Sequence, residues 1–313
     1  MALVRNILVV SYSQTGQLTR IINSIIQPLL HHDLVKVDFL TVSPQVDFPF
    51  PWSFFKFFQI MPESVYMKPI ALKNEQNDDV NNVEKQSYDL IILSYQVWFL
   101  SPSLPISSFL QSKQAKALFD DVPVITVVGC RGMWLTAQSK VKSLLSNLNA
   151  RLIDNIVLTD NCGAAFSFLA TPLWMLTGKK QPLTWIPKAG VSDQDIIQAQ
   201  RFGIALKERF ELDANKLVKP IMTGLQAVKI NEKLIISEKI GHRSFKVWGK
   251  LLMLLGPQNS LRRYFGLCFY FTFLLALIVT VVPITALIIK LVSPLFSKQL
   301  AKQKAYYAQP SGE

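Results

Sequence analysis

Two segments about 80 residues apart carry the side chains best suited to hold a ligand. In the first, the apolar run 7–10 breaks into a polar loop just before a helical pattern begins. The loop residues are Ser13, Gln14, Thr15, Gly16 and Gln17. A helix N-terminus offers N–H groups without partners and a dipole that attracts negative charge, so this loop predicts an anion site.

The second segment places aromatic side chains where another strand should end. The apolar run 90–93 leads into Gln96, Val97, Trp98 and Phe99. Trp98 and Phe99 are positioned to cover a flat ring. Together with the anion loop they predict a site for a phosphorylated planar cofactor, and FMN is the natural candidate.

The chain around these loops alternates strand and helix. Strands are expected near 4–11, 33–40, 88–95, 122–129 and 151–159, and helices near 16–30, 102–112, 135–148 and 192–211. The strands are continuous apolar runs, as expected when helices cover both faces of a parallel sheet. We therefore expect a doubly wound α/β domain over residues 1–212, with a five-stranded parallel sheet and its ligand at the carboxyl ends of the strands.

Two apolar insertions interrupt this alternation, at residues 46–70 and 161–190. The first is dense in phenylalanine and proline, and the second contains the apolar run 164–176. Either both are ordinary core, or they line an apolar pocket or touch a membrane surface. The second interpretation suits a lipid-like alkyl substrate.

The net charge of +12 is concentrated at one end of the chain. Residues 1–213 carry 19 Lys and Arg against 18 Asp and Glu, whereas residues 214–313 carry 14 against 3. The same region contains 264–289, which has no charged residue and is long enough to cross a bilayer. The pattern argues against nucleic acid as a partner. It predicts a basic juxtamembrane segment 213–263, a transmembrane helix 264–290 and a basic tail 291–313.

The three cysteines, Cys130, Cys162 and Cys268, have neither disulfide nor metal-site spacing, so no metal is expected. The first apolar run is too short for a signal peptide. These observations predict a single-pass inner-membrane protein whose N-terminal domain lies in the cytoplasm.

The loop Ser13-Gln-Thr-Gly16 resembles the FMN-phosphate loop of flavodoxin-like proteins and quinone reductases, whose pattern is Ser/Thr-x-Thr-Gly-x-Thr. This chain departs from the pattern at Leu18, where its hydroxyl comes one place late, at Thr19. The resemblance implies that Gln96–Phe99 is the second flavin loop. The third would be Gly129, Cys130, Arg131 and Gly132, where Arg131 either offsets the charge of a reduced flavin or is a simple surface arginine.

Three longer runs resemble the family of dialkylresorcinol condensing enzymes. They are residues 48–55, 95–105 and 129–134, and the similarity extends over about residues 4–210. The resemblance implies a role in aryl polyene or flexirubin-type pigment pathways, beside a ketosynthase-like protein and an acyl carrier protein. In such a pathway the expected reaction is oxidative cyclisation or aromatisation of a 2,5-dialkylcyclohexane-1,3-dione.

Three functions remain open from the sequence. A flavin suits the aromatase, because an enolised dione can pass a hydride to it. A carbon–carbon condensing enzyme would need a nucleophilic cysteine with a histidine partner, and Cys130 has no well-placed one. The alternatives are a membrane-bound NAD(P)H:quinone reductase and a cofactor-free flavodoxin-like scaffold. Tyr95 and Asp160 are weak candidates for proton transfer, the catalytic residues stay unassigned, and a homodimer is left open.

Overall fold

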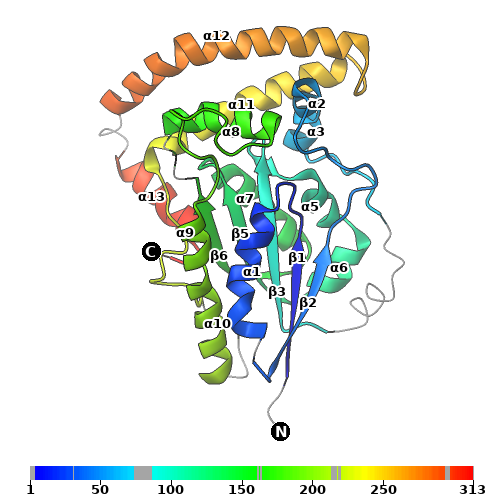
Figure 1. Ribbon diagram of the computed structural model, residues 1–313, viewed down its shortest axis with the longest axis vertical. Helices are drawn as coiled ribbons and strands as arrows, with labels where there is room; N and C mark the ends of the chain where they lie inside the picture. The colour runs from blue at the N-terminus through cyan, green and yellow to red at the C-terminus, as the bar shows by residue number, and fades with distance from the viewer. Residues whose placement is uncertain are drawn as a thin grey trace.

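The computed structural model describes residues 4–30, 32–73, 87–160, 162, 164–212, 217, 220–292 and 297–312. Strands are interspersed with helices as far as β6, and the elements described after it are all helices (Figure 1). In chain order they are β1 (Arg5–Ser11), α1 (Gln17–Leu30), β2 (Val35–Thr41), α2 (Phe54–Gln59), α3 (Met61–Tyr66), β3 (Leu90–Trp98), β4 (Ser101–Pro102), α5 (Leu104–Phe109), α6 (Lys113–Phe119), β5 (Pro123–Cys130), α7 (Leu135–Asn147), β6 (Arg151–Thr159), α8 (Ala164–Thr177), α9 (Asp193–Gln198), α10 (Gln200–Leu212), α11 (Glu232–Leu254), α12 (Leu261–Val292) and α13 (Ser297–Ala308).

The sheet has the order β2-β1-β3-β5-β6, and every pair along this path is parallel. Counted along the chain, the five strands follow 2-1-3-4-5, which is the flavodoxin-like order of a doubly wound sheet. The predicted fold class is confirmed in this respect. The sheet has six strands instead of five, because the two-residue β4 pairs antiparallel with the end of β3.

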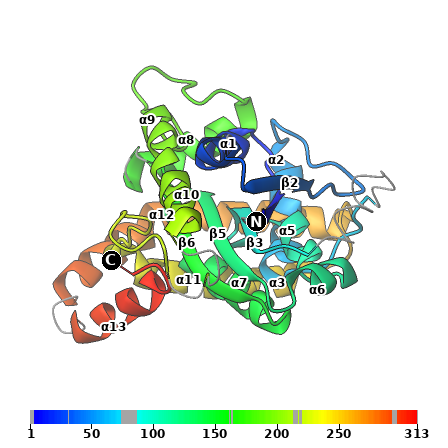
Figure 2. The same ribbon diagram turned by 90° about the horizontal axis from the view of Figure 1, so that it is seen from below.

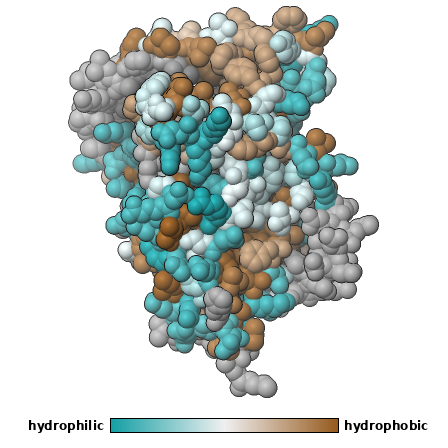
Figure 3. Space-filling view, viewed as in Figure 1, coloured by the Kyte–Doolittle hydropathy of each residue, from teal (hydrophilic) through white to brown (hydrophobic). Residues whose placement is uncertain are grey.

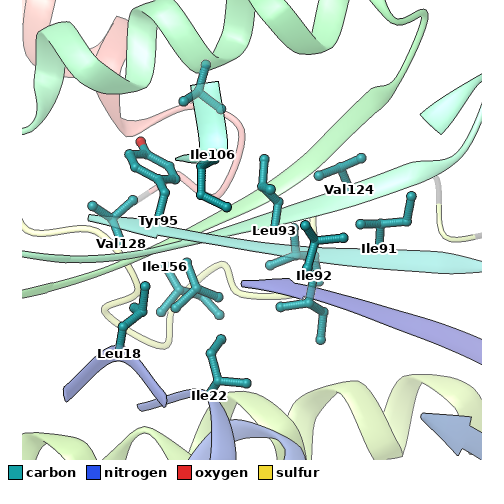
Figure 4. Close-up of a cluster of buried hydrophobic side chains, with 14 of the residues drawn as sticks. Leu18, Ile22, Ile91, Ile92, Leu93, Tyr95, Ile106, Val124, Val128 and Ile156 are labelled. Atoms are coloured by element: carbon teal, nitrogen blue, oxygen red, sulfur yellow. The ribbon is translucent and has the colours of Figure 1, made fainter. Parts of the chain in front are cut away.

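Helices cover both faces of the sheet. Viewed from below, α1 and α10 lie on one side of the strands, and α5 and α7 on the other (Figure 2). Figure 4 shows Leu18 and Ile22 reaching the sheet from α1, while Tyr95 and Ile106 lie on the opposite side. Both faces of the central strands are therefore buried, which explains why their sequences are continuously apolar.

Two of the expected helices differ in the structure. Within the segment expected at 102–112 only α5 is helical, since Pro102 belongs to β4 and Ser112 caps the next helix, α6, by accepting from Ala115 N. The segment expected at 192–211 divides at Ala199 into α9 and α10.

The carboxyl ends of the strands lie beneath a layer of helices (Figure 1). The first insertion supplies α2 and α3, and the second supplies α8. The C-terminal part of the chain adds α11 and α12 above them. A doubly wound fold binds its ligand at this edge of the sheet. Here the edge is covered by a roof of helices that lie outside the alternating core.

The predicted transmembrane helix 264–290 and the single-pass membrane topology are wrong. Within the described ranges, no helix is sufficiently long and apolar to cross a membrane. The segment belongs to α12, whose first half packs against α2 and α11 and buries Leu267 and Tyr270. Arg263, at the start of the supposed span, is only 1% exposed and pairs with Glu63 of α3. The prediction failed because it was made from the apolar residues along the chain, which do not reveal that the helix packs against α2, α3 and α11.

The end of the chain docks on the sheet. Asn155 of β6 donates its backbone N–H to Ser311 Oγ, which in turn donates to Asn155 O. Thr223 donates to the carbonyl of Ser311, and Lys142 to that of Gln309. The described residues beyond α13 are therefore part of the folded domain.

Candidate functional site

The polar loop turns between β1 and α1, as the sequence predicts. Gly16 has φ +73° and precedes the first residue of α1. This left-handed conformation is the one that favours glycine. A Cβ built at Gly16 would meet no atom within 4 Å, so the outer side of the loop is open. The turn stands at the β1/β3 switch point, where this strand order binds ligands.

The hydroxyl groups of the loop are weakly engaged within the protein. Ser13 Oγ accepts from Thr19 N at 3.4 Å, and Thr15 Oγ1 accepts from Gln17 N at 3.4 Å. Both distances lie at the long end of hydrogen bonding. The two hydroxyl protons and the first-turn amides of α1 therefore form a donor set suited to a phosphate.

Two buried polar atoms, one in this loop and one in the first insertion, lack partners in the described part of the chain. Gln14 donates from Nε2 to Pro49 O at 2.9 Å, which joins the loop to the first insertion. Its Oε1 has no partner, and neither does Trp52 Nε1 in the same insertion. Gln14 Oε1 thus keeps an unused acceptor and Trp52 Nε1 an unused donor. Together with the donor set of the loop, this unused capacity fits a polar, phosphorylated ligand.

Gln17 and Leu18 have structural roles that the sequence did not reveal. Gln17 exchanges two hydrogen bonds of 3.1 Å with the backbone of Val191 and so ties the loop to the end of the second insertion. Leu18 is 1% exposed. A Cβ at Gly129 would lie 3.3 Å from Leu18 Cδ1, so this leucine packs against the end of β5. The departure from the phosphate-loop pattern at Leu18 therefore faces the core.

The second predicted loop is a tight hairpin. β3 runs through Gln96 and Val97 to Trp98, which pairs with Ser101 of β4. Phe99 and Leu100 form the two-residue turn, and both have positive φ (47° and 58°). Two-residue hairpins favour positive φ because it matches the twist of their strands, although bulky residues rarely adopt it.

Trp98 lies inside an aromatic cluster. Its ring packs edge to face against Tyr12 at 5.9 Å, Phe48 at 5.0 Å and Trp52 at 6.0 Å. Trp98 is 6% exposed, so it has little surface free to cover a ring. Phe99 turns away and packs against Phe57 at 4.9 Å. The first insertion thus contacts the second loop directly.

The third predicted loop follows β5. Gly129 and Cys130 end the strand, and Gly132 has φ +148°. Burial raises the pKa of the Cys130 thiol to about 12, so the thiolate needed for covalent condensation is not populated near neutral pH. Burial also lowers the pKa of Arg131, and the negative charge of Asp160 opposes that decrease. Arg131 is therefore a partly buried cation beside a carboxylate.

A residue from the C-terminal region completes this loop. Glu238 of α11 is 1% exposed and accepts from Thr136 N at 2.5 Å and Leu135 N at 3.3 Å, so it caps the N-terminus of α7. Burial raises the pKa of Glu238, while these N–H bonds oppose the increase. Glu238 is one of only three acidic residues after position 213, and that scarcity was the single sequence signal that could have singled it out.

The two candidates for proton transfer have structural partners. Tyr95 is fully buried and donates to Gln138 Oε1 at 2.5 Å. Burial raises the pKa of Tyr95 well above its ordinary value. Asp160 accepts from Cys162 N at 2.7 Å and Gly190 N at 3.1 Å, so it fixes both ends of the second insertion. Neither residue is assigned a catalytic role.

A partly buried lysine behind the second loop gives a pH-dependent prediction. Lys140 donates to Ser101 Oγ at 2.7 Å and Val65 O at 2.8 Å, and burial together with the charge of Lys246 lowers its pKa from 10.5 to about 8. Between these two values the unfolded chain binds one more proton than the folded one. The free energy of unfolding should therefore rise with pH across the window. Urea denaturation at both ends of the window should show this rise in the wild type and a smaller one in Lys140→Met. An equal rise in the free energy of unfolding in the wild type and in Lys140→Met would show that Lys140 is not the group responsible.

No protein-family model and no curated protein matches this chain. Several solved structures resemble it. A flavoprotein from Lactobacillus acidophilus in complex with FMN has 17% identity and a TM-score of 0.37, and the match covers 49% of this chain and 92% of the other. A flavodoxin from the domain Archaea has 10% identity and a TM-score of 0.37, covering 66% and 99%. A flavone reductase has 10% identity and a TM-score of 0.35, covering 67% and 64%. At such scores the fold of this chain is defined by its own strand order and registers.

Proposed function

We propose that this protein is a flavin-dependent oxidoreductase that holds FMN at the carboxyl edge of its sheet. The observation that carries this proposal is the open turn at Gly16, which begins α1 at the switch point of a flavodoxin-like strand order. FMN also agrees with the class of the similar solved structures, one of which contains it.

The chain's own residues would divide the binding between them. Ser13, Thr15 and the first-turn amides of α1 hold the phosphate, and Gln17 keeps the loop in place through Val191. Gln14 Oε1 and Trp52 Nε1 supply a buried acceptor and donor. Bound FMN would supply hydride chemistry to this site. The roof of α2, α3, α8 and α11 would exclude water from it.

Reduction of a flat, apolar acceptor such as a quinone by NAD(P)H is the reaction we favour. The rings of Tyr12, Phe48, Trp52 and Trp98 pack together where the first insertion meets the second loop, and aromatic side chains suit an aromatic substrate. The thiol of Cys130 is held in its neutral form, which removes the clearest nucleophile.

A second candidate is the oxidative aromatisation of a 2,5-dialkylcyclohexane-1,3-dione. It is favoured by the contact between two of the runs that resemble dialkylresorcinol condensing enzymes, because Phe48 and Trp52 of the first run pack on Trp98 of the second. In that role the protein would act on a lipid-like alkyl substrate beside a ketosynthase-like protein and an acyl carrier protein.

Anaerobic spectroscopy of the FMN-loaded full chain separates the two reactions. Bleaching of the flavin absorbance by NADH or NADPH, followed by reoxidation with a quinone, is the expected result. Bleaching by the dialkylcyclohexanedione alone, with release of the resorcinol, would establish the aromatase. A chain that takes up no FMN would contradict both and leave the cofactor-free scaffold.

A further inference from the structure

The outward face of α12 is apolar. The helix buries Arg263, Leu267 and Tyr270 against the rest of the protein. On its other side, Phe265 is 68% exposed and Val279 73% exposed, and their neighbours along the helix are similarly uncovered. These neighbours are Leu261, Phe269, Leu275 and Ile284.

α11 extends the same surface. Its exposed apolar side chains are Val247, Leu251 and Leu254, with Leu254 75% exposed. Trp248 joins the two helices by packing on Phe269 at 5.9 Å and Phe273 at 5.0 Å. The space-filling view shows apolar residues gathered along the top of the molecule, over α12 (Figure 3). Soluble monomers rarely expose so continuous an apolar patch unless it is an interaction site.

Most of the chain that forms this patch carries charge of one sign. Residues 239–312 contain ten Lys and Arg and not one Asp or Glu. Arg243, Lys246, Lys250 and Arg262 are exposed on α11 and at the start of α12. The uncovered apolar face is therefore accompanied by basic side chains.

We propose that this face adsorbs to an anionic phospholipid surface, with α12 lying along the headgroup region without crossing the bilayer. A helix that presents phenylalanine and aliphatic side chains beside lysine and arginine is suited to the interface, where the apolar part enters the acyl boundary and the cations meet the headgroups. A second copy of this chain fits less well, because pairing the same face would bring two basic patches together. This inference does not depend on FMN.

Flotation of the purified full chain with lipid vesicles tests the proposal. It should bind vesicles of phosphatidylcholine with phosphatidylglycerol, bind phosphatidylcholine alone more weakly, and lose affinity in high salt. Lys250→Gln with Arg262→Gln should weaken binding by about fivefold for each charge removed. Phe265→Gln with Val279→Gln should weaken it by about tenfold or more, since two exposed apolar side chains would no longer enter the lipid.

The matched control carries Ile197→Gln and Ile204→Gln, which are 68% and 45% exposed on α9 and α10. It should bind like the wild type, and all variants should keep the wild-type melting temperature. Binding that survives the α12 substitutions, or no binding to either vesicle, would overturn the proposal. So would a dimer, measured by light scattering, that Phe265→Gln with Val279→Gln dissociates, because the face would then belong to a second copy.

Discussion

Gly203→Ala is expected to destabilise the protein by roughly 3 kcal/mol or more, because overpacking at a rigid contact forces backbone to move. A Cβ at this position of α10 would lie 1.8 Å from Ile25 O and 3.0 Å from Pro28 Cδ of α1. The first atom is backbone and has no rotamer that would relieve the clash. Helix propensity alone predicts the opposite sign, a gain of about 1 kcal/mol when alanine replaces glycine.

The backbone movement that relieves this clash should also weaken ligand binding. α1 begins at the phosphate loop, so a shift of this helix would move Gly16 and the donors around it. Urea denaturation gives the change in stability, and FMN titration of the folded fraction gives the change in affinity. Gly241→Ala in α11 is the matched control, since its Cβ would meet only Leu100 Cδ1 at 3.4 Å. Equal effects of the two substitutions would show that α1 and α10 are not in such close contact.

Glu63→Gln is expected to cost roughly 3–5 kcal/mol, because it leaves a buried guanidinium without its counter-charge. Arg263 is 1% exposed and pairs with both oxygens of Glu63, at 2.8 and 2.6 Å. The same guanidinium donates to Gln59 O. These contacts attach the start of α12 to α2 and α3, so hydrogen exchange in α12 should increase together with the loss of stability.

Two comparisons isolate this ion pair. Asp193→Asn removes the partner of Arg20 in an exposed pair at 2.8 Å and should change stability little. Replacing both Glu63 and Arg263 by methionine should recover much of the stability lost in Glu63→Gln, because no uncompensated charge would remain. If Glu63→Gln matched Asp193→Asn, Arg263 would have to be solvated, and α12 would not be held as described.

Local patterns predicted the central part of the fold. The apolar runs that became β1, β3 and β5 and the polar turn at Gly16 depend on neighbours in sequence, and the structure places them as expected. The sequence could also predict that the loops after β1, β3 and β5 lie at the same edge of the sheet, because the carboxyl ends of parallel strands meet there. The hairpin at Phe99 and Leu100 could not be predicted, because bulky residues such as these do not indicate a turn in which φ is positive.

Contacts between distant segments account for what the sequence did not show. Arg263 looks like the flank of a membrane span until Glu63, 200 residues earlier, is placed beside it. Glu238 lies far from the third loop in sequence and caps α7 only because α11 crosses that loop. Leu18 looked like a lost phosphate ligand, whereas its contact with Gly129 makes it core.

The measurement that tests the central claim most directly is a comparison of FMN and riboflavin binding to the full chain by quenching of flavin fluorescence. The phosphate loop should make FMN bind more tightly, and Ser13→Ala with Thr15→Val should narrow the difference between the two flavins. Riboflavin shares the ring but lacks the phosphate, so the difference reports on the turn at Gly16. Equal affinity for both flavins, or no binding of FMN, would contradict a flavin site at this loop.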